Sequence, residues 1–191
     1  TYLLEAYQNQ QNLPIIQNQL SRFMTEDADA NFNDSLKKAL LLRAQKTQDV
    51  FWNDFLSWFF VQQKEYGKAF IQQKAIYKRN PESFGNIVNL GEMAIEDNDQ
   101  DSAKEILTFV IENTNDLELL IQAHSYLMEM KIDHATDKDY MAITAELDQL
   151  IKEFGVSPYT LSLLELEADF TAFHMNNPEK AKVILKNAME M

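Results

Sequence analysis

The sequence predicts an all-α protein of about eleven helices joined by short polar loops. Two observations predict this class. Only four Gly and four Pro occur in 191 residues, whereas a fold of many strands and tight turns needs both residues at its turns. Apolar residues recur with helical spacing almost from end to end, and no segment alternates with period two for long enough to form a strand. The length suits one domain, or at most two small ones.

Each expected helix follows from a run of apolar residues and from the signals at its ends. Pro14 suits the first turn of the second helix, where a missing N–H costs nothing. Asn33 or Asp34 is expected to cap the third. The fourth is the most apolar, with two Trp and four Phe. The expected helices cover about 1–9, 13–25, 32–46, 49–63, 66–79, 83–97, 100–113, 117–131, 138–153, 159–175 and 178–190.

The charge and composition exclude several classes of function. A net charge of -13 and a pI near 4.6 disfavour nucleic acid and anionic membrane surfaces, because both attract clustered Lys and Arg. The absence of Cys excludes disulfides, a thiolate nucleophile and Cys-ligated metal centres. No apolar run reaches 18 residues and no targeting segment is recognised, so we expect a soluble protein without direct membrane insertion, of unknown localisation.

A spacing of 34 residues relates two stretches of the chain. The equivalent pairs are Leu56 and Leu90, Ser57 and Gly91, Ala69 and Ala103, and Pro81 and Asn115. Ser57 and Gly91 are small residues, each in the middle of the first helix of its stretch. Ala69 and Ala103 lie near the start of the helix that follows in each stretch. Bulky side chains at such positions would force the two helix axes apart, so the spacing predicts close packing of consecutive helices.

This pattern resembles the tetratricopeptide repeat family. The residues that carry the resemblance are Leu56, Ser57, Phe60, Tyr66, Ala69 and Pro81, then Leu90, Gly91, Ala94, Ala103 and Leu107, and the segment Asn177-Pro178-Glu179-Lys180-Ala181 with Leu185 and Ala188. The resemblance implies a right-handed α-solenoid of antiparallel helix hairpins. Residues 1–48 would form a degenerate N-terminal hairpin region, and 49–191 one continuous solenoid of four repeats, about 50–82, 84–116, 117–155 and 158–191.

The third of these repeats departs from the pattern. Asp137 stands where a small residue is expected, so Ala142 or Ala145 is predicted to take that role at the helix crossing. Gln73 likewise stands where the family usually places an aromatic residue or Leu. The resemblance covers about 49–191 well and the rest of the chain weakly.

No catalytic, cofactor or metal site emerges from the residue patterns. The segment 97–101 alternates acids like a calcium loop, but Ser102 and Thr108 stand where such a loop needs Gly and Glu. Its acids are better explained as a turn that caps the next helix. Glu165, Glu167 and Asp169 lie at spacing two on one helix and do not converge. The three histidines, His124, His134 and His174, form no i, i+4 pair, and the acidic loop at 133–139 is expected to be solvated.

In the family that the chain resembles, the first helices of successive hairpins line a concave peptide-binding groove. The positions that would face it here are Asp54, Trp58 and Val61, Val88, Glu92 and Ile95, Gln122, Tyr126 and Glu129, and Leu166, Phe170 and Phe173. One position recurs in the four repeats, as Trp58, Glu92, Tyr126 and Phe170. Aromatic residues of this kind anchor binding partners, although an aromatic stripe can equally belong to the core.

Three functions fit these observations. The first is a non-enzymatic scaffold whose groove binds a neutral, basic or apolar protein or peptide, since its expected residues include acids and no Lys or Arg. The second is a structural spacer or oligomerisation segment of a larger protein, with no groove ligand. The last helix supports it, because its apolar residues suit contact with further repeats or a second copy. The third is an enzyme assembled around His124 and Glu129 or around the loop 133–139.

Overall fold

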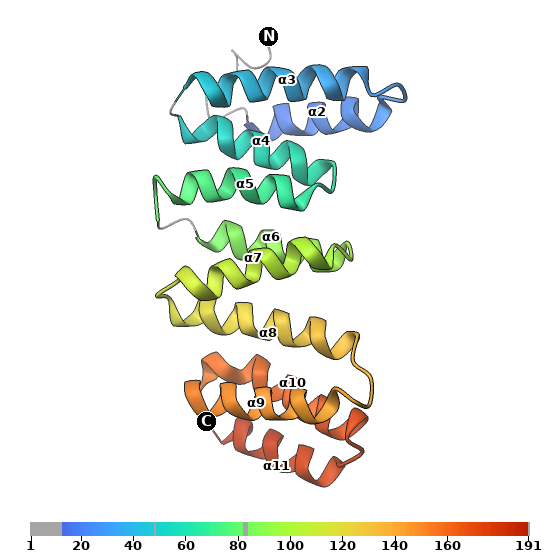
Figure 1. Ribbon diagram of the computed structural model, residues 1–191, viewed down its shortest axis with the longest axis vertical. Coiled ribbons are helices and arrows are strands. Elements are labelled where there is room, and N and C mark those ends of the chain that lie inside the picture. Colours follow the sequence, from blue (N-terminus) through green and yellow to red (C-terminus); the bar gives the residue numbers. More distant parts are fainter. Residues whose placement is uncertain (1–12, 48, 82–83, 191) are drawn as a thin grey trace. The chain divides into compact units, whose positions relative to one another are not determined.

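The computed structural model describes residues 13–47, 49–81 and 84–190, and the chain divides into two compact units, Thr1–Glu82 and Ser83–Met191. The described part is all-helical (Figure 1), which confirms the predicted class. It contains ten α-helices and no strand within those ranges. The helix expected at 1–9 lies outside them. The division falls between residues 82 and 83, and the boundary expected between 48 and 49 stays a prediction. None of the described helices is long and apolar enough to cross a bilayer.

The first unit contains four described helices, α2 (Leu13–Glu26), α3 (Asn31–Lys46), α4 (Val50–Gln62) and α5 (Tyr66–Tyr77). Asp49 caps α4 by accepting a hydrogen bond from the Phe51 amide. The cap expected at Asn33 or Asp34 is wrong, because α3 begins at Asn31 and both residues lie inside its first turn. Asp27 instead accepts a hydrogen bond from the Asn33 amide at 2.8 Å, so an acid before the helix satisfies that donor.

Helices α4 and α5 pack closely along a shared seam. Ser57 lies at their point of contact, and its hydroxyl donates to the carbonyl oxygen of Ala69 at 3.3 Å. Phe55, Phe59 and Phe70 are buried beside this seam. A small residue in α4 therefore meets the small residue of α5, as the repeat spacing predicts.

The second unit contains the remaining helices and two short irregular turns. The helices are α6 (Phe84–Glu96), α7 (Gln100–Asn113), α8 (Leu117–Asp133), α9 (Tyr140–Phe154), α10 (Leu161–Asp169) and α11 (Pro178–Met189). A 3-10 turn, Pro158–Thr160, precedes α10, and a π-helical turn, Phe170–His174, follows it. Asp99 caps α7 through the Ser102 amide, which confirms the capping interpretation of the segment 97–101.

The contact between α6 and α7 depends on Gly91. A Cβ atom at this position would lie 2.9 Å from Cδ2 of Leu107 and 3.3 Å from Cγ2 of Ile106. Leu107 and Ile106 are fully buried, so they occupy the space that a side chain at residue 91 would need. Glycine is therefore the residue that permits this helix spacing.

The turns between paired helices repeat with the same period. Ala30, Lys64 and Asn98 all have positive φ, at 56°, 56° and 62°, and they lie 34 residues apart (30 to 64 to 98). The amides of Ala30, Lys64 and Asn98 each donate to the carbonyl three residues earlier. At the second and third turns the amide of Glu65 also donates to Phe60 and that of Asp99 to Ala94. These are the long bonds of a left-handed helix C-cap. The period thus extends to the turn between α2 and α3, within the region expected to be degenerate.

The third repeat lacks the close helix pair seen in the first two. Helices α8, α9 and α10 share one core instead, made of Ile121, Met128, Ile143, Leu147, Leu150, Leu163 and Phe170. The small-residue role predicted for Ala142 or Ala145 is wrong, because both side chains are exposed. Ile143, Leu147 and Leu150 lie on the opposite face of α9, where their size fills a three-helix core that needs no close crossing.

Replacement of Gly91 by Leu should lower the free energy of unfolding by about 2 kcal/mol, because the added side chain collides with Leu107 in a filled interior. Replacement of Ala145 by Leu is the matched control, since this exposed helical position should change stability by less than about 0.5 kcal/mol. Urea unfolding followed by circular dichroism measures both. Equal stability losses in the two variants would contradict the assigned role of Gly91.

Candidate functional site

The groove positions predicted in the first unit share one face of α4. Asp54 is exposed, and Trp58 and Val61 are half-buried. Gln73 on α5 donates to Oδ1 of Asp54 at 3.2 Å, and the Trp58 ring packs on Phe55 with centroids 5.2 Å apart. Trp58 is therefore partly committed to the core and keeps only part of its ring accessible.

In the second unit the positions predicted on α6 and α8 come together. Tyr126 of α8 lies close to Glu92 of α6, and Gln122 donates to the phenol oxygen of Tyr126 at 3.4 Å. Burial raises the pKa of Tyr126, and the negative charges of Glu92 and Glu129 raise it further. Glu92, Gln122 and Tyr126 are half-buried and Glu129 is exposed. We call these four residues the Tyr126 cluster.

Three other predicted positions differ widely in exposure. Val88 and Phe170 are buried, with 1% and 2% of their surface exposed, so neither is open to a ligand. Phe170 begins the π-helical turn and packs edge-to-face on Tyr140 inside the three-helix core. Phe173 is 82% exposed at the same turn. The two remaining positions, Ile95 and Leu166, are half-buried.

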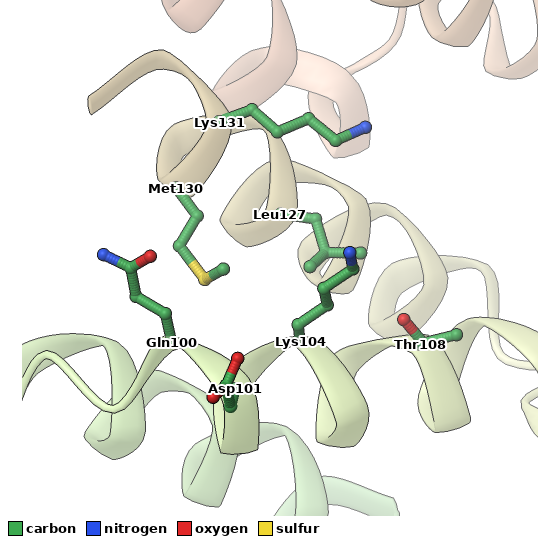
Figure 2. Close-up of a pocket in the computed structure, with 7 residues that line it drawn as sticks. All are labelled: Gln100, Asp101, Lys104, Thr108, Leu127, Met130 and Lys131. Carbon is green, nitrogen blue, oxygen red and sulfur yellow. The ribbon is translucent and has the colours of Figure 1, made fainter. Parts of the chain in front are cut away.

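A pocket of about 460 Å³ lies between α7 and α8, at a place where no site was predicted. Figure 2 shows side chains from both helices around it. Its lining residues are Gln100, Asp101, Lys104, Thr108, Leu127, Met130 and Lys131. On α7 the lining residues at positions 100, 104 and 108 share one face of the helix, a spacing that is visible in the sequence. The sequence does not show that α8 packs against this face, so it could not predict the pocket.

A second pocket of about 370 Å³ adjoins the first and shares Lys131 with it. It is lined from α8 and α9, and the Lys131 ammonium pairs there with Glu146. The imidazole of His134 donates from Nδ1 to the carbonyl of Met130 at 3.0 Å, because a carbonyl can only accept. Nε2 is then free to accept from the amide of Gln100, which joins the linings of the two pockets.

The loop between α8 and α9 is organised by its own hydrogen bonds. Asp139 accepts from the amide and the hydroxyl of Thr136 at 2.9 and 2.7 Å, and these bonds lower the pKa of its carboxyl. Within the described ranges no three His, Asp or Glu side chains converge as metal ligands. His124 is half-buried against Phe154, and burial lowers its pKa.

A buried carboxyl group at the junction of α9, α10 and α11 was also missed by the spacing argument. Glu167 is only 5% exposed and lies 3.6 Å from the ammonium of Lys180. Burial raises the pKa of Glu167, and the negative charge of Asp148 raises it further, whereas Lys180 opposes the shift. The partners of Glu167 come from two other helices, so spacing along α10 could not reveal them. The two carboxyls and one ammonium form an ionic junction that joins the three helices.

Replacement of Glu92 by Gln should lower the pKa of Tyr126, because it removes a carboxylate that holds the phenol proton. Titration of the phenol by ultraviolet difference absorption or by NMR measures the shift. Glu118, an exposed acid in the first turn of α8, provides the matched Gln control, which should leave the titration of Tyr126 in place. Identical titration curves in wild type and both variants would show that Glu92 has no influence on the pKa of Tyr126.

The raised pKa of Glu167 predicts a pH-dependent stability. The folded protein holds this proton more tightly than the unfolded chain, so the free energy of unfolding should fall as pH rises from the ordinary glutamate pKa through the raised one. Glu167→Gln cannot lose a proton and should remove that decline, whereas Glu165→Gln, at an exposed position on the same helix, should retain it. Urea unfolding across this pH range tests the difference, and parallel profiles would refute it.

Comparison of the chain with models of protein families, with curated proteins and with solved structures finds no match. No relative therefore assigns a role to the Tyr126 cluster or to the α7/α8 pocket. The case for a function rests on the residues of these two sites and on the repeat geometry of the helices that carry them.

Proposed function

We propose that this chain is a non-enzymatic scaffold that binds a protein or peptide segment on the exposed face of its first hairpin helices. The observation that carries the proposal is the proximity of Glu92 on α6 to Tyr126 on α8, in two helices that pack on each other. These residues lie 34 positions apart and are equivalent in consecutive repeats. Stacked repeats place equivalent residues of neighbouring first helices side by side, which is how a continuous ligand-binding face arises.

The same proposal assigns the helix pairs to antiparallel hairpins of the tetratricopeptide kind. Close packing of α4 with α5, α6 with α7 and α10 with α11 supports it. So do the small residues at the crossings, Ser57 against Ala69 and Gly91 against Leu107, and the turns of matching geometry. The right-handed, continuous solenoid expected from the sequence stays a prediction.

The Tyr126 cluster favours a basic or neutral partner. Glu92 and Glu129 contribute two carboxylates beside an aromatic ring, and none of the four residues is cationic. An acidic segment would meet like charge at this place. A Lys or Arg side chain could instead pair with the acids and stack on the phenol ring, which is a favourable cation–π arrangement. Apolar neighbours in the same segment would cover the half-buried Ile95.

Assembly through α11 is a second candidate function, favoured by one observation. Val183, Leu185 and Met189 expose 58%, 41% and 86% of their surface on this helix. Apolar side chains in such number on one helix suit contact with further repeats or with a second copy. In this alternative the chain is a spacer or oligomerisation segment and the Tyr126 cluster has no ligand.

Selection of short random peptides displayed on phage tests the scaffold proposal. The wild-type chain should enrich sequences that contain Lys or Arg next to apolar residues. Replacement of Tyr126 by Ala should weaken the selected peptides by about 2 kcal/mol, or about thirtyfold, as for an aromatic hot spot. Tyr159→Ala provides the matched control, because Tyr159 is 60% exposed in the same unit and lies outside the cluster.

Two results would count against this function. One is enrichment of acidic peptides, and the other is equal affinity of a selected peptide for wild type and the folded Tyr126→Ala variant. A stable dimer by light scattering, in a preparation that enriches no peptide, would favour assembly through α11 instead.

A further inference from the structure

We propose that the pocket between α7 and α8 binds a small monoanion with an apolar body, of the class of a medium-chain carboxylate. This site is separate from the Tyr126 cluster and does not rest on the proposed function. Its residues on α8 are Leu127, Met130 and Lys131, which occupy a different face of the helix from Gln122, Tyr126 and Glu129. The inference follows from the shape, the apolar wall and the charge of the pocket.

The pocket exists because α7 presents polar side chains where it faces this part of α8. Gln100, Lys104 and Thr108 form one stripe of α7, and none of them fills the space between the helices as Leu or Phe would. Leu107, the neighbour of Thr108, turns to the other side and fills the contact with Gly91. Leu107 and Ile106 are thus committed to α6, and polar side chains of α7 line the gap toward this part of α8.

The wall on the α8 side is apolar. Leu127 and Met130 are half-buried, and both line the pocket. Figure 2 shows the Met130 thioether reaching down toward α7 beside Gln100. Methionine adapts its shape to the ligand it contacts, and an alkyl chain that covers these two side chains would remove apolar surface from water. The volume of about 460 Å³ falls within the range of known small-molecule sites.

The charge of the lining selects a single negative charge. Lys104 extends from α7 toward Leu127 in Figure 2, and within the described ranges its ammonium forms no ion pair. Lys131 is already paired with Glu146. Asp101 lies on the same lining, so a dianion such as a phosphate monoester would meet repulsion there. One unpaired cation in a protein of net charge -13 therefore suits a monocarboxylate.

The ligand would lie with its carboxylate on Lys104 and its chain along Leu127 and Met130. Thr108 lines the pocket on the α7 side, where its hydroxyl can donate to the second carboxylate oxygen, whereas the Gln100 amide already donates to His134. A chain of about eight carbons fits inside a pocket of this size with space left over. Octanoate is accordingly the probe of choice, with octanamide as its uncharged analogue and acetate as the anion without a chain.

Titration of the full chain with octanoate, followed by amide NMR and calorimetry, tests the proposal. Octanoate should bind at one site and shift amide signals of α7 and α8, while octanamide and acetate should bind at least tenfold more weakly. Lys104→Gln should weaken octanoate about tenfold, because it removes a charge-assisted hydrogen bond. Lys152→Gln removes an exposed lysine of α9 and should leave the affinity unchanged.

Three results would overturn the proposal. They are equal binding of octanoate and octanamide, unchanged octanoate affinity in the Lys104→Gln variant, and shifts confined to the exposed apolar residues of α11. Because Lys104 is exposed, the variant should keep the helical content and thermal stability of the wild type. Failure of this experiment leaves the peptide selection at Tyr126 unaffected, so the two proposals are judged separately.

Discussion

The close approach of paired helices at small residues is the constraint on which the rest of each unit depends. In the second unit the space beside Gly91 belongs to Leu107, and this contact fixes how α7 is rotated about its axis. Lys104 and Thr108 are then directed away from α6 and toward α8, where they line the pocket. In the first unit Ser57 does the same with a hydroxyl that reaches the carbonyl of Ala69. A residue without a large side chain thus determines where its neighbours point.

Helix α8 is the element on which the features of the second unit converge. Tyr126 meets Glu92 of α6, Leu127 and Met130 face the pocket toward α7, and Ile121 belongs to the core shared with α9 and α10. A helix whose side chains pack against other helices on three faces has little freedom to shift. It therefore holds the Tyr126 cluster and the pocket lining in fixed relation to each other, although the two sites use different residues and suit ligands of opposite charge.

The helices were largely predictable from the sequence, and the sites were less so. Apolar spacing placed α4 and α7 within a residue or two of their observed bounds, because a helix must direct its large side chains to one side. The 34-residue period identified Glu92 and Tyr126 as equivalent positions, but it did not predict that their side chains interact. Val88 and Phe170, expected on the groove face, are buried, because a stripe of apolar residues at helical spacing suits a core as well as a binding face. The pocket and the Glu167 junction were missed because their residues lie on different helices.

The left-handed turns at Ala30, Lys64 and Asn98 show where the repetition of this chain resides. Their side chains have nothing in common, yet their backbone angles and spacing agree closely. Ala and Lys accept this conformation at a cost that Gly would avoid, so the geometry is imposed by the helices on either side of the turn. In such a repeat the backbone φ angles are more alike than the residue types that adopt them. Two chains could then share this architecture, turn for turn, while their sequences align poorly.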